Sequence, residues 1–430
     1  MRLYRVVVLV ALAACRGHFD DRVDTSGIDA TSRTAITLSV QGHGVVLVDG
    51  HAPCADTCTY DDGVLNLSTW SGDGWQLSGF SNTCATATSC AAQPGESVTV
   101  SFARSPITAN LAFVTTQLSP RTGLAGLDMT CATAASAAGL SGTFLAFAST
   151  STVNARDRFA SSRGWVRTDG LALYDTISDI TLNTRPRSVS LDEIGMLIPD
   201  GTVAVTGTNE NGNVNTQTCN DWTSASAALQ VTVIYPAWVG IYSVSNVNTS
   251  CNSPTRVFCM QNDRNVPLPP VAPAPMGRYV FVSSQTWVPG GGIASADAEC
   301  ATEAAAANLS GTYAALLATT TMTAAEHVGG VRGLFRRTDG VVVSFEGLDA
   351  PELDAAITMT AGGTFASAGT LDSILGASSL NVVGDGTCSD WTDSTAVGRK
   401  GFFAVSTTPF ARIFAPQCNF ANRLVCVQLP

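Results

Sequence analysis

Thirteen cysteines are the residues of this 430-residue chain whose spacing could most readily support chemistry. Twelve of them form three groups of four, at positions 54, 58, 84 and 90, then 131, 219, 251 and 259, then 300, 388, 418 and 426. Only Cys54 and Cys58 are spaced like metal ligands, and no histidine lies near enough to complete a zinc cluster. The groups therefore predict six disulfides formed in an oxidising compartment, with Cys15 left over.

Residues that could support catalysis are few. The chain has four histidines, His18, His43, His51 and His327. None of them is duplicated between the two copies of the internal repeat described below. Metalloprotease, serine-hydrolase and phosphate-loop motifs are missing from the sequence. A hydrolytic carboxylate pair is the remaining alternative, although no spacing brings together the four candidates Asp169, Asp221, Asp339 and Asp390. We expect a protein that is not an enzyme, has no cofactor or metal, and has ligand-binding residues that the sequence does not identify.

The charge of the chain limits its partners. Only 13% of residues are charged, and the formal net charge is −11. Nucleic acid is excluded as a partner, because phosphate binding needs a basic face. Many small and β-branched residues favour strands and tight turns over surface helices.

The first fifteen residues have the pattern of a secretion signal. Arg2 and Arg5 precede an apolar run, Val6–Ala14, which is too short to span a bilayer. Leu12-Ala-Ala-Cys15 resembles the lipobox of bacterial lipoproteins, in which the cysteine receives diacylglycerol. The alternative is an ordinary signal peptide with a chance cysteine. The resemblance implies an N-terminal acyl anchor in a lipid bilayer and a cell-envelope location, at an outer membrane or the cell surface.

An internal repeat organises most of the chain. Four segments recur at an offset of 168 to 170 residues: Leu111–Gln117 with Tyr279–Gln285, Leu140–Thr143 with Leu309–Thr312, Arg167–Gly170 with Arg337–Gly340, and Cys219–Thr223 with Cys388–Thr392. A period this long predicts two whole domains and not a solenoid. The predicted order is signal peptide 1–15, flexible tether 16–35, small all-β domain 36–104, first repeat domain 111–262, proline-rich linker 263–277 and second repeat domain 278–430.

Each repeat has the pattern of a strand, a helix, a second short helix and then several short strands. The first strands are expected at 113–116 and 279–284, and the alanine-rich helices at 126–138 and 294–307, ending near Gly139 and Asn308. The second helices are expected at 153–159 and 323–328. Later strands are expected at 164–167, 203–207, 229–235 and 401–406, and those of the small domain at 36–40, 45–48, 64–67 and 97–102.

The cysteine positions and the repeated segments of the two repeats resemble those of known folds. One cysteine on the helix, one past the midpoint and two near the end resemble the C-type-lectin-like fold. The repeated segments also resemble a family of uncharacterised domains of bacterial lipoproteins, grouped with the C-type-lectin and endostatin superfamily. Gly72-Asp-Gly-Trp75, followed by Cys84 and Cys90, is similar to a divergent internalin-type B-repeat. The resemblance implies a β-rich α+β fold, with two tandem C-type-lectin-like domains after a small all-β domain.

Four cysteines allow three disulfide connectivities, and the resemblance implies one of them. The lectin-like pattern pairs the first with the last and the two in between, which gives Cys131–Cys259, Cys219–Cys251, Cys300–Cys426 and Cys388–Cys418. In the small domain the local pairs are Cys54–Cys58 and Cys84–Cys90.

The motif by which C-type lectins hold calcium is missing from both repeats. The repeated Asp-Trp follows the second cysteine, so we expect Trp222 and Trp391 to fill the core and Asp221 and Asp390 to accept local backbone hydrogen bonds. Asn209–Asn213 and the repeated Arg-Thr-Asp-Gly are expected to be turns. The expected function is non-catalytic binding or adhesion, to a glycan or to an envelope or matrix protein. The alternative is a structural envelope protein without a small ligand.

The state of Cys15 is directly measurable. We expect the mature protein to begin at acylated Cys15 and to contain no free thiol, because the lipid accounts for the odd cysteine. Intact-mass analysis before and after alkylation checks this. An unmodified Cys15, or an alkylated thiol elsewhere, would contradict it.

Overall fold

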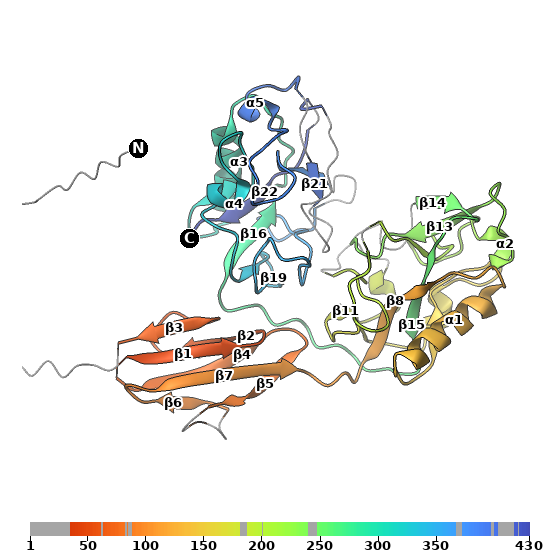
Figure 1. Ribbon diagram of the computed structural model, residues 1–430, viewed down its shortest axis with the longest axis horizontal. Coiled ribbons are helices and arrows are strands. Elements are labelled where there is room, and N and C mark those ends of the chain that lie inside the picture. The colour runs from red at the N-terminus through yellow and green to blue at the C-terminus, as the bar shows by residue number, and fades with distance from the viewer. Residues whose placement is uncertain are drawn as a thin grey trace, which may run out of the picture.

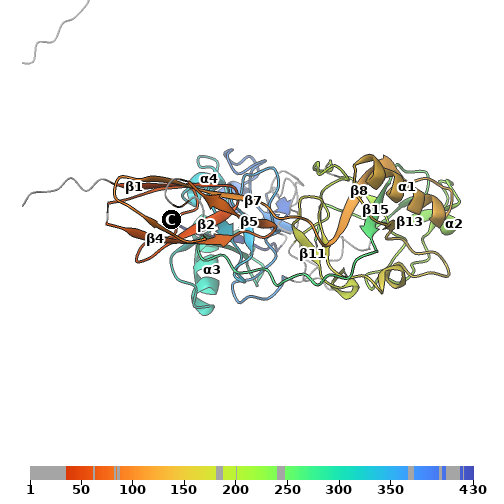
Figure 2. The same ribbon diagram turned by 90° about the horizontal axis from the view of Figure 1, so that it is seen from below.

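The computed structural model describes residues 35–430 except 62, 82–83, 85–87, 181–186, 200, 240–246, 367–371, 397–399, 403–416 and 420. The signal segment 1–15 with Cys15, and the tether up to residue 34, lie outside the described residues. Within the described part, no helix is long and apolar enough to cross a membrane. The sheets are confined to three stretches of chain, which lie against one another, with the second repeat domain over the small domain and the first beside both (Figures 1 and 2).

The small domain is a sandwich of two sheets. One sheet has the order β3-β1-β7-β5 and the other β2-β4-β6. Alternate side chains of β1 and β7 point inward, so that Ile36, Leu38, Val98 and Val100 are buried, as expected for half-buried strands. Its strands are β1 (Ile36–Gln41), β2 (Gly44–Val48), β3 (Thr57–Tyr60), β4 (Leu65–Ser71), β5 (Trp75–Phe80), β6 (Cys90–Ala92) and β7 (Ser97–Arg104).

The first repeat domain has one main sheet, with the order β11-β10-β8-β15-β12-β13-β14 and with β9 also paired to β15. The opening strand β8 lies between β10, parallel to it, and the closing strand β15, antiparallel to it. Its elements are β8 (Asn110–Leu118), α1 (Leu124–Ala137), β9 (Phe144–Ala146), η2 (Arg156–Phe159), β10 (Trp165–Val166), β11 (Ala172–Tyr174), η3 (Ile177–Ile180), β12 (Ala204–Val205), α2 (Cys219–Trp222), β13 (Gln230–Ile234), β14 (Val247–Ser250) and β15 (Arg256–Gln261).

The second repeat domain repeats this pattern in the order β17-β22-β16-β18-β19, with a separate β20–β21 pair. Its opening strand also lies between a parallel and an antiparallel neighbour. The elements are β16 (Arg278–Val282), α3 (Ile293–Ala306), β17 (Tyr313–Ala315), α4 (Ala324–His327), β18 (Phe335–Arg336), β19 (Val342–Ser344), β20 (Asp372–Ile374), α5 (Cys388–Trp391), β21 (Lys400–Phe402) and β22 (Val425–Gln428).

The long helices α1 and α3 are fixed to their sheets by disulfides. Cys131 and Cys300 are fully buried on the sheet-facing sides of the helices and bond Cys259 on β15 and Cys426 on β22. Both helices end in a left-handed residue, Gly139 at φ 72° and Asn308 at φ 56°, where the sequence predicts an end. The other disulfides are also the expected pairs: Cys54–Cys58, Cys84–Cys90, Cys219–Cys251 and Cys388–Cys418.

The sequence located the main elements but missed several short ones. Both second helical turns form within the expected ranges, whereas both alanine-rich helices and both opening strands overlap theirs and begin one to three residues earlier. Three strands of the small domain, β3, β5 and β6, were not expected. The last expected strand, 401–406, lies partly outside the described residues, and β21 covers its start.

The contributions of the disulfides to stability should differ with loop length. The Cys131–Cys259 bond spans 128 residues and Cys54–Cys58 only 4. Replacing the first pair with alanine should lower the free energy of unfolding by about 5 kcal/mol and the second by about 2 kcal/mol, in the loop-entropy account. Urea unfolding of the whole chain measures both, and equal losses would contradict the prediction.

Candidate functional site

The repeated Cys-Asn/Ser-Asp-Trp segments form left-handed turns. In α2 and α5 four successive residues have φ between 50° and 70°, a conformation that costs roughly 1–2 kcal/mol per residue. Trp222 is fully buried and its Nε1–H donates to Ser149 O at 2.8 Å, and Trp391 does the same to Ala318 O at 2.9 Å. The core position of both tryptophans agrees with expectation.

The aspartates of these turns make a contact that the sequence analysis described wrongly. We expected local backbone bonds, but Asp221 accepts from Ser151 N–H at 2.7 Å and Asp390 from Thr320 N–H at 2.7 Å, each 70 residues away. Hydrogen bonds from the hydroxyl and then the N–H of Ser151 lower the pKa of Asp221, and those from the N–H and then the hydroxyl of Thr320 lower the pKa of Asp390. Both aspartates therefore hold a distant loop against the turn, a structural role.

Two other motifs are turns, as expected. Asn209 Oδ1 accepts from the N–H groups of Asn211 and Asn213. In the Arg-Thr-Asp-Gly segments the glycine N–H donates to the arginine C=O, with Gly170 at φ 89° and Gly340 at φ 85°. Sequence reasoning did not foresee that the arginines of these turns, Arg167 and Arg337, are almost fully buried.

Arg167 connects the two repeat domains. Its guanidinium forms ion pairs with Asp169 of its own turn at 2.6 Å and with Glu352 of the second repeat domain at 2.5 Å. Ser190 donates to the same Glu352 carboxylate. Among the described residues, Arg337, the counterpart of Arg167, bonds Asp339 and Thr358 of its own domain. The same turn therefore makes an interdomain contact in one repeat and an internal contact in the other.

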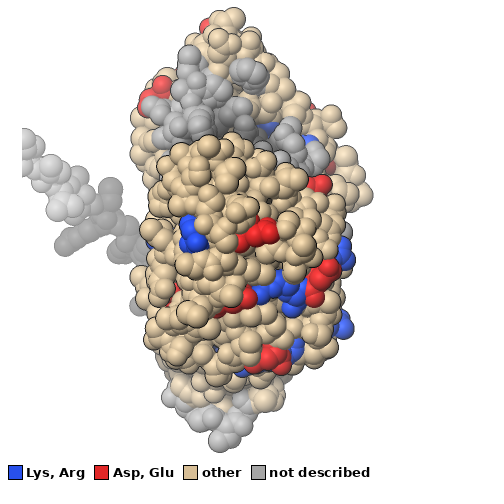
Figure 3. All heavy atoms as spheres, turned by 90° about the vertical axis from the view of Figure 1, so that its right-hand side faces the viewer, with Lys and Arg blue, Asp and Glu red and all other residues tan. Residues whose placement is uncertain are grey.

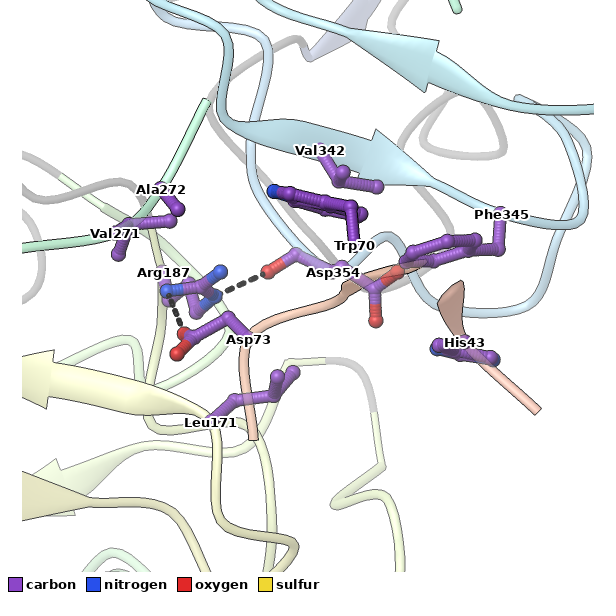
Figure 4. A pocket seen from close by; sticks show the side chains of 10 residues that line it. All are labelled: His43, Trp70, Asp73, Leu171, Arg187, Val271, Ala272, Val342, Phe345 and Asp354. Carbon is purple, nitrogen blue, oxygen red and sulfur yellow. Dashed lines mark hydrogen bonds and ion pairs between the residues drawn. The ribbon is translucent and has the colours of Figure 1, made fainter. Parts of the chain in front are cut away.

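Arg187 contacts all three domains. Its side chain is 2% exposed, and its Nη1 lies 2.7 Å from a carboxylate oxygen of Asp73 in the small domain. Nε donates to the backbone oxygen of Asp354 in the second repeat domain at 3.0 Å, and Nη1 also donates to Ala172 O at 3.2 Å. Figure 4 shows the guanidinium between Asp73 and Asp354. We call Asp73, Arg167, Arg187, Glu352 and Asp354 the junction.

A stack of rings continues the junction. The imidazole of His43 lies between Trp75, at 4.6 Å, and Phe345 of the second repeat domain, at 4.4 Å. The guanidinium of Arg104 lies over the ring of the same Trp75, 4.5 Å from the ring centroid. Burial, and then the charge of Arg104, lower the pKa of His43 to about 4, so the ring is neutral at pH 7. The stack is therefore an apolar contact between the domains.

The Gly72-Asp-Gly-Trp75 segment makes much of this contact. Asp73 also accepts from Ala172 N–H at 3.2 Å. Gly74 has φ 71° and lies so close to Gly170 that a Cβ there would be 3.0 Å from the Gly170 carbonyl oxygen. The segment is thus the edge by which the small domain docks on the first repeat domain.

Two grooves flank the linker where it leaves the junction. We call residues 268–272 the linker strap. One groove, of about 360 Å³, lies between the strap, residues 71–75 of the small domain and residues 105–109. The other, of about 310 Å³, is lined by the strap, β11 and Arg187. Hydrogen bonds fix the linker at both ends, from Leu268 N–H to Asp175 and from Ala274 N–H to Gly340 O.

The residues considered for metal binding and catalysis take part in structural contacts. Among them no group of three His, Cys, Asp or Glu side chains could hold a metal ion. His327 pairs with Asp297 at 3.0 Å, where the first repeat has Arg158 paired with Asp128 at 2.6 Å, so this contact fastens a helix in both repeats. Of the four carboxylates considered for hydrolysis, Asp169 and Asp339 bond the arginines of their own turns. The other two, Asp221 and Asp390, bond loops 70 residues away. The arrangement can position domains and bind a ligand in a groove.

Comparison with known proteins adds no relative: no protein-family model matches the chain, and no curated protein matches it.

The junction and the ring stack beside it contain one group each, Asp354 and His43, with opposite pH dependence. Burial raises the pKa of Asp354 to about 6, against the opposing charges of Arg187 and Arg167, with Glu352 and Asp169 adding to the rise. His43, which faces Arg104 and Asp169, is shifted downward. The folded protein therefore binds a proton at Asp354 more readily than the unfolded chain, and at His43 less readily.

Single substitutions should separate the two effects. In Asp354→Asn the melting temperature should fall as pH drops from 6.5 towards 4, because unfolded His43 then takes up a proton that folded His43 resists. In His43→Gln the melting temperature should rise relative to that of Asp354→Asn as pH drops from 6 towards 4. The reason is that Asp354 takes up a proton at a higher pH in the folded protein than in the unfolded chain. Thermal unfolding at pH 4 to 7 measures the difference, and parallel pH profiles would contradict it.

Proposed function

We propose that this protein is a non-catalytic, extracytoplasmic binding or adhesion protein, and that the grooves beside the linker strap are its ligand site. The observation that carries the proposal is the pair of grooves at a meeting point of domains. Their volumes, about 360 and 310 Å³, are in the range of small-molecule sites, and domain interfaces are where such sites usually occur. Because the Arg187–Asp73 pair and the hydrogen bonds of Leu268 and Ala274 hold the walls, little ordering is needed when a ligand binds.

The proposal includes the lectin-like identity of both repeat domains. The strand–helix opening, the disulfide from that helix to the closing strand and the duplicated topology support it. Binding through the loop calcium site of C-type lectins is not part of the proposal, because that motif is missing from the sequence. A site at the junction needs no metal ion.

The location follows from the cysteines. Six disulfides belong to a protein of an oxidising, extracytoplasmic compartment. We further propose that lipid on Cys15 anchors the chain in a bilayer at an outer membrane or the cell surface. The face in Figure 3 has scattered charges among uncharged residues, which suits contact with uncharged surfaces better than with nucleic acid.

Blocking the groove tests the proposed function. The whole chain in detergent is applied to immobilised peptidoglycan, lipopolysaccharide, collagen and fibronectin. We expect saturable binding to at least one of them, and a loss of about tenfold or more with Ile107→Trp, which fills the larger groove. Leu118→Trp, at an exposed position of the same domain, is the matched control. Absence of binding, or equal binding by both variants, would contradict the proposal.

A structural envelope protein is the second candidate, and one observation favours it. A hairpin in the first repeat domain exposes Ile194 by 66% and Met196 by 61%, although Asp192 Oδ1 holds it rigid by accepting from the backbone N–H of both residues. The equivalent hairpin of the second repeat domain carries Gly362 and Thr364 at these positions. The fold therefore does not require the apolar tip, and a protein partner would explain it.

Crosslinking in intact cells decides between the candidates. A photo-crosslinker at Met196 should capture one dominant envelope protein if the structural role is correct, and the same probe at Thr364 should not. Equal capture at both positions would remove the support for this candidate.

A further inference from the structure

We infer that the grooves beside the linker strap bind a neutral oligosaccharide. This inference rests on the proposed binding function and adds the chemical class of the ligand. The proposed site lies where the small domain meets the first repeat domain, and not in the loops of either repeat domain.

The charges lining the grooves favour an uncharged ligand. The charged residues that line them are Asp73, Asp175 and Arg187. Asp73 and Arg187 pair with each other at 2.7 Å, and Asp175 pairs with Arg163 at 2.5 Å and accepts from Leu268 N–H. An anionic or cationic ligand would have to compete with these internal pairs, and a neutral one would not.

The uncharged groups of the wall suit a ligand rich in hydroxyls. Ser71, Ser105 and Thr108 line the larger groove, and none of their hydroxyls makes a hydrogen bond within the part of the chain that the structure describes. Each hydroxyl can donate and accept, as sugar hydroxyls do. Pro106 and Pro269 add apolar ring surface to the same groove, which can pack against the C–H faces of a sugar.

A peptide fits the grooves less well. Extended peptides usually add a strand to a free sheet edge, and the edge strand here is β11, which borders both grooves. At Ala172 of β11 the N–H already donates to Asp73, and the C=O already accepts from Arg187. The backbone groups of Ala172, the residue of β11 that borders both grooves, are therefore occupied, whereas the side-chain hydroxyls of the larger groove are not.

Binding arrays test the ligand class with the whole disulfide-bonded chain. The array holds neutral glucans, mannans, galactans and N-acetylglucosamine oligomers, acidic glycans with uronic or sialic acids, and neutral peptides including proline-rich ones. The strongest binder is then titrated by calorimetry against the wild type, Thr108→Trp, the double variant Ser105→Ala/Thr108→Val, and Ser141→Trp as an exposed control. Thermal unfolding establishes that each variant is folded.

We expect a neutral glycan as the strongest binder. Thr108→Trp should abolish its binding, the double variant should weaken it by about thirtyfold through the loss of two hydrogen bonds, and Ser141→Trp should leave it unchanged. An acidic glycan or a peptide that is lost in Thr108→Trp would overturn the ligand class while supporting the proposed function. A neutral glycan that Thr108→Trp still binds would overturn the site. No binding to any probe would count against the proposed function itself.

Discussion

The arrangement of the three domains depends on one buried cation, the guanidinium of Arg187. A charge removed from water is stable only where hydrogen-bond acceptors surround it. Here the acceptors come from the small domain, from β11 and from the second repeat domain. If any one of these parts moved away, the cation would lose an acceptor, and breaking a buried pair typically costs about 3–5 kcal/mol. This cost favours the arrangement in which all three domains contact Arg187.

The junction also determines where ligands could bind. The contact of Gly74 with Gly170 brings the small domain against the first repeat domain, and the linker strap then passes beside the line of contact. Hydrogen bonds at Leu268 and Ala274 fix the strap between the domains, so that it divides the space beside it into two grooves. The proline-rich segment is therefore part of a wall as well as a connection, a role for which the fixed φ of proline suits it.

Local patterns in the sequence predicted much of the fold and little of the site. Alanine-rich runs ended by Gly139 and Asn308 located α1 and α3, because helix ends depend on neighbouring residues. The disulfide pairs followed from the resemblance to lectin-like domains. The left-handed turns at Cys219 and Cys388 could not be predicted, since tertiary contacts of Trp222 and Trp391 stabilise a conformation that local propensity opposes. The junction was missed for the same reason: Asp73, Arg187 and Glu352 are far apart in the chain, and the one motif among them, Gly72-Asp-Gly-Trp75, gives no sign of its partners. Their one signal was the rarity of charge in this sequence, which makes each buried arginine noteworthy.

The two Arg-Thr-Asp-Gly turns imply an order of events during export. Arg337 finds its acceptors within its own domain, but Arg167 depends on Glu352, which lies 185 residues further along the chain. A chain that crosses a membrane from its N-terminus delivers Arg167 and Arg187 before the second repeat domain has emerged. Until then these two cations lack the acceptors that Glu352 and Asp354 supply in the folded chain. The second repeat domain emerges last, and it supplies the remaining hydrogen-bond acceptors of Arg167 and Arg187 in the first repeat domain.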